Sequence, residues 1–251
     1  MITPKNKENP ILSLFCNIFI PVIILKNGNK WINKILIKYH GEEWAYQNST
    51  IVDISSIVFF IALIFPVIYF FYDLLNRKNI NLISILGFIN ILLTGGIGIF
   101  GARFGLSKNW FILKEGMLPI LIGLMLIIMS KYRKSSFKNI LLNKVLFDND
   151  KISISIKEDM RYEFEYIVRK AGYHLIAGFF ISSIIQFGLA FLIVVSNPGE
   201  SSFNKEVSTM TWVSYVAVLL PTMLIVGKGY LGLISGIEKI TGLKKEEFLK
   251  S

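Results

Sequence analysis

Two short stretches of the sequence place a lysine next to a glutamate, just before an apolar run that contains a proline. They are Trp110-Phe-Ile-Leu-Lys114-Glu115 and Ser202-Phe-Asn-Lys205-Glu206. An ammonium group beside a carboxylate could bind a polar ligand, and the repetition favours two related hairpins that share one site. Glutamate near a helix start also complements the helix dipole, and lysine near a membrane surface extends its amine to water. Two interpretations of the Lys-Glu pairs therefore remain open: together they form one binding site, or each is an anchor at the membrane interface.

Two amide side chains within long apolar runs could extend such a site. Amides at membrane depth usually hydrogen-bond across helices. No Asp, Glu or Arg falls near the middle of an apolar run, whereas ion-coupled carriers normally need such groups. The candidate polar residues are therefore Asn90, Lys114, Glu115, Gln186, Lys205 and Glu206.

Other kinds of chemistry find little support in the sequence. His40 and His174 are far apart, and Cys16 is the single cysteine, so neither a metal centre nor an intramolecular disulfide is predicted. Gly95-Gly96-Ile-Gly98 superficially resembles a nucleotide loop, but it lies in an apolar run with no preceding strand. Small residues there favour close helix packing. We expect no catalytic residues, no metal, no cofactor and no enzymatic activity.

The composition predicts which elements position these residues. Of 251 residues, 53% are hydrophobic and only 18% are charged, whereas soluble domains contain about a quarter charged residues. Apolar runs close to the roughly 20 residues that cross a bilayer recur along the chain. We predict an all-α polytopic membrane protein with one membrane domain over residues 1–251. Its six transmembrane helices are expected at about 10–25, 51–72, 82–102, 110–130, 173–195 and 211–227.

The first apolar segment, 10–25, is short and contains Pro21, so it either spans the membrane or enters as a re-entrant half-helix. Residues 26–48 predict an amphipathic helix in the interface, which serves as a surface anchor or as a lipid-headgroup site. The residues expected to contact lipid there are Trp31 on the apolar face and Lys30, Lys34 and Lys38 on the basic face.

The distribution of Lys and Arg predicts the orientation in the membrane. Basic residues are concentrated in the loop 131–172, in which amphipathic helices are expected, and they recur in both terminal segments. Because basic loops remain on the cytoplasmic side, the loop and both termini are predicted to be cytoplasmic. A re-entrant first segment would instead give five full spans and an external amino terminus. The net charge of +10 therefore indicates membrane lipids as partners and not nucleic acid.

Several short sequence motifs, distributed over nearly the whole chain, together form a pattern. They are Asn9-Pro-Ile-Leu-Ser-Leu, Tyr72-Asp-Leu, Leu93-Thr-Gly-Gly-Ile-Gly98, Lys114-Glu-Gly-Met-Leu-Pro119, Phe203-Asn-Lys-Glu206, Leu220-Pro-Thr-Met223 and Thr241-Gly-Leu243. This pattern resembles a little-characterised family of bacterial multi-pass inner-membrane proteins related to intracellular septation protein A. The segment 26–48 is longer and more basic than the family pattern. The resemblance implies an inner-membrane location and a link to the cell envelope and cell division, and it supplies no catalytic residues.

Two functions follow as hypotheses. The first is a non-enzymatic inner-membrane protein that supports envelope integrity or division, and its partners could include other envelope or division proteins. The alternative is a transporter or flippase-like carrier for a lipid or a small metabolite. The repeated Lys-Glu hairpins and the prolines within apolar runs favour the carrier, because carriers often contain interrupted helices.

Overall fold

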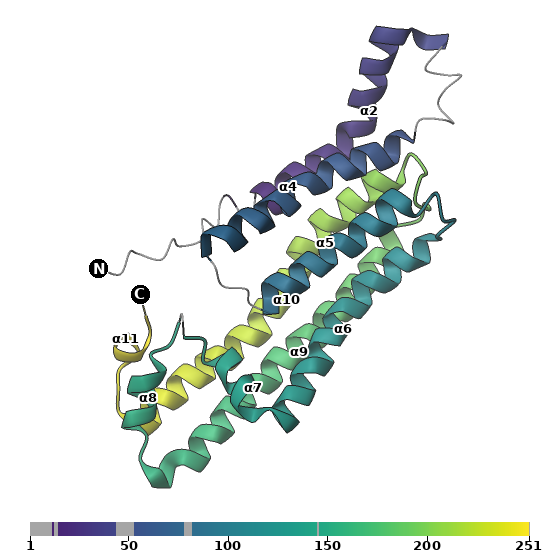
Figure 1. The fold of residues 1–251 in the computed structure, drawn as a ribbon. Helices are drawn as coiled ribbons and strands as arrows, with labels where there is room; N and C mark the ends of the chain where they lie inside the picture. Colours follow the sequence, from purple (N-terminus) through teal and green to yellow (C-terminus); the bar gives the residue numbers. More distant parts are fainter. Residues whose placement is uncertain (1–11, 13–14, 44–52, 78–81, 145, 251) are drawn as a thin grey trace. The chain divides into compact units, whose positions relative to one another are not determined.

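The structure is a computed structural model that describes residues 12, 15–43, 53–77, 82–144 and 146–250 (Figure 1). The helices in chain order are η1 (Phe15–Phe19), α2 (Ile20–His40), α4 (Ile54–Arg77), α5 (Leu82–Phe100), α6 (Lys108–Tyr132), α7 (Lys134–Leu141), α8 (Asn149–Ser155), η2 (Glu158–Met160), α9 (Arg161–Ile193), α10 (Phe203–Thr241) and α11 (Lys245–Phe248). Within the described residues, β-type pairing is limited to an isolated bridge between Phe147 and Leu249. The all-α prediction is therefore confirmed for this part of the chain.

Within the part of the chain that the structure describes, four helical segments are long and apolar enough to cross a membrane. These segments are Ile54–Leu75, Lys108–Tyr132, Glu158–Ile193 and Phe203–Thr241, which contain the predicted second, fourth, fifth and sixth spans almost completely. The predicted third span coincides with α5, whose apolar part is the shorter segment Phe88–Phe100. Part of the predicted first span, 10–25, lies outside the described residues. A multi-span helical membrane protein is supported by the four segments, and the number six stays a prediction.

Two helices extend well beyond the predicted spans. The helix α9 joins the expected amphipathic helix of the basic loop to the fifth span without a break. No proline interrupts it, and at Gly172 the ring of Phe137 occupies the space of a side chain. The helix α10 likewise joins the sixth span to the glycine-rich segment that follows, and Pro221 lies inside it. The glycine-rich segment 227–242 is predicted as a helical continuation of the sixth span, and α10 bears this out as far as Thr241. In α9, by contrast, the structure joins two pieces that the sequence pattern separates.

The expected boundary near residue 26, between the first apolar segment and the interface helix, is absent. The helix α2 continues unbroken through this position. Gly28 is buried, and a side chain there would collide with Val58 of α4. This glycine therefore does not end the helix; it permits α2 to pack closely on α4. Pro21 lies in the first turn of α2, directly after the π-helix η1.

Contacts divide the chain into two compact units, residues 1–115 with 187–216 and residues 116–186 with 217–251. In the first unit, α2 packs on α4 and α4 packs on α5 (Figure 1). The buried core of this unit consists of Leu25, Phe59, Ala62, Phe111, Ile112, Ala190, Val194, Phe203, Val207 and Met210. A side chain at Gly98 would collide with Phe59, and one at Gly95 with Leu63. The predicted packing role is therefore confirmed for these two glycines.

In the second unit, the basic loop folds together with the carboxyl-terminal segment. The rings of Phe147 and Phe248 stack with their centroids 6.4 Å apart, and the backbone N–H of Asp148 donates to the carbonyl of Phe248 at 2.8 Å. Both phenylalanines belong to one hydrophobic cluster with residues of α7, α8, α9 and α10. The loop 131–172 thus contains more than separate amphipathic helices, because α11 completes its core.

Candidate functional site

Lys114 lies in the first two turns of α6, where the helix is held firmly in the first unit. The helix begins at Lys108, whose backbone N–H donates to Asn197 Oδ1 and whose Nζ donates to the Val195 carbonyl, each at 3.0 Å. Phe111 and Ile112 are buried in the core. Because Phe111 and Ile112 are part of this core, the same stretch of α6 carries Lys114 into the interior of the unit.

The ammonium group of Lys114 is enclosed by oxygen acceptors. Its side chain is only 5% exposed. The Nζ atom donates to Thr94 Oγ1 and Glu115 Oε1 at 2.6 Å and to Asn90 Oδ1 at 3.2 Å. It also lies 4.8 Å from the centroid of the Phe111 ring. Because an ammonium group has three N–H donors, each donor has a protein acceptor.

The pairing explains how a charge is tolerated in this place. A buried ammonium without a partner is strongly unfavourable, whereas a charged pair with further hydrogen bonds can offset its desolvation. Adjacent residues of a helix do not normally face each other, so the contact between Lys114 and Glu115 is no ordinary helix pair. It forms where the lysine meets the acceptors of α5. Glu115 remains 15% exposed at its side chain.

On α5, Asn90 and Thr94 are one turn apart and present their oxygens to the same ammonium group. The Thr94 hydroxyl donates to the Asn90 backbone carbonyl at 2.8 Å, which leaves its oxygen lone pairs to accept from Lys114. Asn90 was predicted as a site residue, and Thr94 was not. The spacing of four between an amide and a hydroxyl in an apolar helix is the signal that could have identified the pair.

The second Lys-Glu pair has a different arrangement. Glu206, in the first turn of α10, accepts with Oε2 from the backbone N–H groups of Val195 at 3.0 Å and Ser196 at 2.8 Å. Its Oε1 accepts from the Ser196 hydroxyl at 2.7 Å. Lys205 is exposed, and the ion pairs found among the described residues do not include it. Glu206 therefore closes the loop between α9 and α10.

Gln186 belongs to the second unit and bonds within its own helix. Its Nε2 donates to Ser182 Oγ, one turn earlier on α9, at 3.2 Å. A hydrogen bond between helices was expected of Gln186. Here Ser183, also on α9, makes such a bond, and its hydroxyl donates to the Gly116 carbonyl of α6 at 2.6 Å. The structure thus brings together Asn90, Lys114 and Glu115, and it gives Gln186, Lys205 and Glu206 other surroundings.

The predicted lipid-contact residues all lie on the exposed surface of α2. Trp31 is 49% exposed. Lys30, Lys34 and Lys38 are exposed as well. Their positions leave them available to lipid, and the contact itself stays a prediction. Among the described residues, no group of three or more His, Cys, Asp or Glu could hold a metal ion.

No protein-family model, curated protein or solved structure matches the chain. The relationship to septation protein A therefore stays a prediction based on the short sequence motifs given above. The chemistry of the candidate site follows from its own geometry. Lys114, Asn90, Thr94 and Glu115 form what we term the Lys114 cluster. It holds a charge between α5 and α6, and an incoming anion could reach the ammonium only by displacing one of its acceptors.

Proposed function

We propose that this chain is a non-enzymatic integral protein of the bacterial inner membrane, of the septation protein A-like type. It supports cell-envelope integrity or division through contacts with membrane lipids and with other envelope or division proteins. Both termini and the loop 131–172 face the cytoplasm. The observation that carries the proposal is the closed pairing of Lys114, whose three donors are all engaged by the protein.

A binding or catalytic ammonium group must offer at least one donor to its substrate. In the Lys114 cluster the donors are directed to acceptors on α5 and to Glu115. Charge-assisted hydrogen bonds of this kind are roughly twice as strong as neutral ones. Their consequence is a fixed register between α5 and α6. This favours a structural role for the Lys114 cluster. We therefore expect the outer surfaces of the helices to make the functional contacts.

The outer surfaces are suited to contacts with lipid and protein. On α10, Leu220, Met223, Leu224 and Leu231 are each at least 60% exposed. Large exposed apolar surfaces on a soluble chain mark interaction or membrane sites. The same helix is long and apolar enough to cross a membrane. Its side chains are therefore expected to contact acyl chains or the helices of a partner.

Deletion of the gene in its host, followed by complementation with the wild-type chain, tests this proposal. We expect altered cell shape or septa and greater sensitivity to detergent and osmotic shock, all reversed by complementation. Microscopy and survival assays provide the measurements. A deletion strain whose envelope is unaffected under all of these stresses would contradict the proposal.

A carrier for a lipid or a small metabolite is the second candidate, and the burial of Lys114 favours it. An ionisable side chain within an apolar helix of spanning length often marks a substrate path. Pro119 follows in the same helix, but α6 continues through it to Tyr132, so this proline does not give the interrupted helix that is common in carriers. A carrier would open the cluster during its cycle, so that Glu115 would meet the substrate.

The variants Glu115→Gln and Glu206→Gln distinguish the two functions. A carrier with its site at these residues predicts that each variant abolishes complementation while protein abundance stays normal. The architectural role predicts that complementation follows abundance, because glutamine keeps an acceptor oxygen and much of the packing. Immunoblots of membrane fractions beside the growth assay supply both quantities. Full complementation by both variants would remove the carrier hypothesis for this site.

A further inference from the structure

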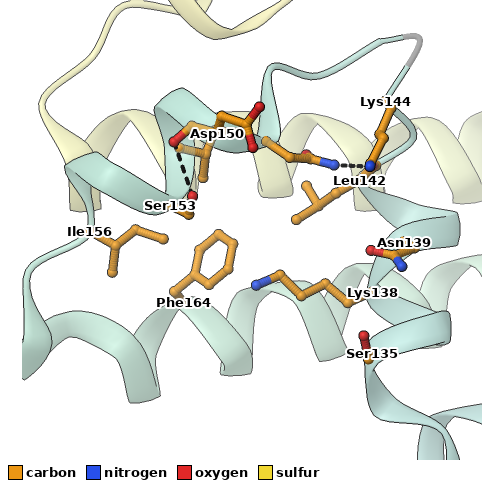
Figure 2. Close-up of a pocket in the computed structure, with 11 residues that line it drawn as sticks. Ser135, Lys138, Asn139, Leu142, Lys144, Asp150, Ser153, Ile156 and Phe164 are labelled. Atoms are coloured by element: carbon orange, nitrogen blue, oxygen red, sulfur yellow. Dashed lines mark hydrogen bonds between the residues drawn. The ribbon is translucent and has the colours of Figure 1, made fainter.

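The second unit contains a pocket of about 250 Å³ that is separate from the Lys114 cluster and was not predicted from the sequence (Figure 2). It lies among α7, α8 and the first turn of α9. Its floor is apolar, because Leu142, Ile152 and Phe164 are each buried and belong to the hydrophobic cluster of this unit. Its rim is polar and consists of Ser135, Lys138, Asn139, Lys144, Asp150 and Ser153.

Three charged residues line this pocket, and the ion pairs found in the described part of the chain do not include them. The Nζ atom of Lys138 lies 4.7 Å from the centroid of the Phe164 ring, and Figure 2 shows it beside that ring in the middle of the pocket. Lys144 and Asp150 are exposed on the rim. Two ammonium groups and one carboxylate are thus available to a ligand.

The walls of the pocket are fixed by hydrogen bonds. The Asn149 side chain donates from Nδ2 to the Leu142 carbonyl at 2.8 Å, which ties α8 to the end of α7. The Ser153 hydroxyl donates to the Asp150 carbonyl at 3.0 Å (Figure 2). Lys151 Nζ donates to the Glu247 carbonyl at 3.2 Å, so the carboxyl-terminal segment supports α8 from outside. A pocket with fixed walls and a mixed rim has the character of a binding site.

We propose that this pocket binds a phosphate ester of a small polar alcohol. The phosphate is bound by Lys138, with Ser135 and Asn139 of the same helix α7 as further donors, because ammonium groups and N–H or O–H donors suit phosphate oxygens. The hydroxyl or amine end of the ligand donates to Asp150, which would repel the phosphate. The carbon atoms lie over the Phe164 ring. The volume is below the roughly 300–1,000 Å³ of sites for drug-sized ligands, so the ligand is no larger than a lipid headgroup.

Such a ligand has two sources, a soluble phosphate ester or the headgroup of a phospholipid. The pocket follows a candidate span directly, because α6 ends at Tyr132 and α7 begins at Lys134. An extended chain covers at most about 3.5 Å per residue, so Lys138 lies within about 20 Å of the end of α6. The headgroup source rests on the proposed membrane location, whereas the soluble source is independent of it.

Titration of the purified full chain in a non-ionic detergent tests the site. The soluble probes are O-phosphoethanolamine and glycerol 3-phosphate, measured by calorimetry. The lipid probes are phosphatidylethanolamine and phosphatidylglycerol, measured as adducts by native mass spectrometry. Binding of the soluble probes identifies a free phosphate ester as sufficient, and binding of the lipids alone identifies a headgroup. Either result supports the proposal, and absence of binding in both arms would overturn it.

The variant Lys138→Gln is expected to weaken binding at least about tenfold, because it removes a charge-assisted hydrogen bond. The matched control is Lys134→Gln, which removes the same charge from an exposed position of α7 outside the pocket lining and should change affinity less than about twofold. Equal weakening by both variants would reveal general attraction to basic surface and overturn the site. Ser135→Ala leaves the contact of Lys138 with the Phe164 ring untouched, and it should weaken binding several-fold even if Lys138→Gln does not fold.

Discussion

The two Lys-Glu pairs share a dipeptide, a nearby aromatic residue and a following proline, yet the structure uses them in opposite ways. In the first pair, the lysine is the buried partner and collects three acceptors from α5 and α6. In the second pair, the glutamate collects three donors from the loop after α9, and the lysine is exposed. The likeness in sequence therefore does not extend to the local chemistry.

The difference shows that the partner helix decides the role of a charged residue. Lys114 lies opposite Asn90 and Thr94, which are acceptors, and so its charge is stabilised inside the unit. Glu206 lies beside backbone N–H groups at the end of α9, which are donors, and there a carboxylate is the stabilised charge. In each pair, the residue without such surroundings is the more exposed one.

The largest effect is expected from Lys114→Met, which leaves Glu115, Asn90 and Thr94 without their donor. Removal of one partner of a buried pair typically costs about 3–5 kcal/mol, and the partial exposure of Glu115 places the expected loss near the lower limit, about 3 kcal/mol. The midpoint of thermal unfolding in detergent, followed by circular dichroism, measures it.

The double variant Lys114→Met with Glu115→Leu is the control for this prediction. Because both charges are then absent, it should be more stable than Lys114→Met alone. A single variant as stable as the wild-type chain would show that the cluster contributes nothing to the bundle. That outcome would favour the carrier hypothesis for Lys114.

A smaller loss, about 2 kcal/mol, is expected from Glu206→Ala. The variant leaves the N–H groups of Val195 and Ser196 without their acceptor, and water can replace it in part because the loop is near the surface. Glu165→Ala removes the same charge from an exposed position of α9 and serves as the matched control. If the two variants lose the same stability, the loop-closing role of Glu206 is wrong.

Thr94→Val is expected to cost about 1 kcal/mol, since it removes one hydroxyl and keeps the shape of the side chain. Thr94→Ser keeps the hydroxyl and should retain most of the stability. Combined with Lys114→Met, the valine variant should cost less than the sum of the two single losses, because the hydroxyl and the ammonium serve the same bond. Strict additivity would contradict a shared cluster.

The sequence predicted the helical class and three members of the Lys114 cluster, because apolar runs and polar residues within them are local features. It did not predict Thr94, because a threonine in a helix normally bonds to its own backbone, and its second partner comes from another helix. It also divided α9 near Gly172. At that glycine the ring of Phe137 from α7 occupies the space of a side chain, and this contact joins residues far apart in the chain.

The pocket of the second unit was missed for the same reason. The spacing of the floor residue Phe164 from neighbouring apolar residues predicts an amphipathic helix, one of those expected in the loop 131–172. The helices α7, α8 and α9 share one hydrophobic cluster with the carboxyl-terminal segment, where Phe248 is fully buried against Phe147. A periodic pattern indicates which face of a helix is buried, and it does not indicate which helices share a core.

The smallest effect is expected from Lys205→Ala, and it sharpens the comparison most directly. If the second pair were equivalent to the first, this variant would resemble Lys114→Met. Because Lys205 is exposed and Glu206 is held by the loop, we expect the free energy of unfolding to change by no more than about 0.5 kcal/mol. Thermal unfolding of both lysine variants under the same detergent conditions measures the contrast. A large loss for Lys205→Ala would restore the paired-site hypothesis, because the exposed lysine would then have a partner that the isolated chain does not contain.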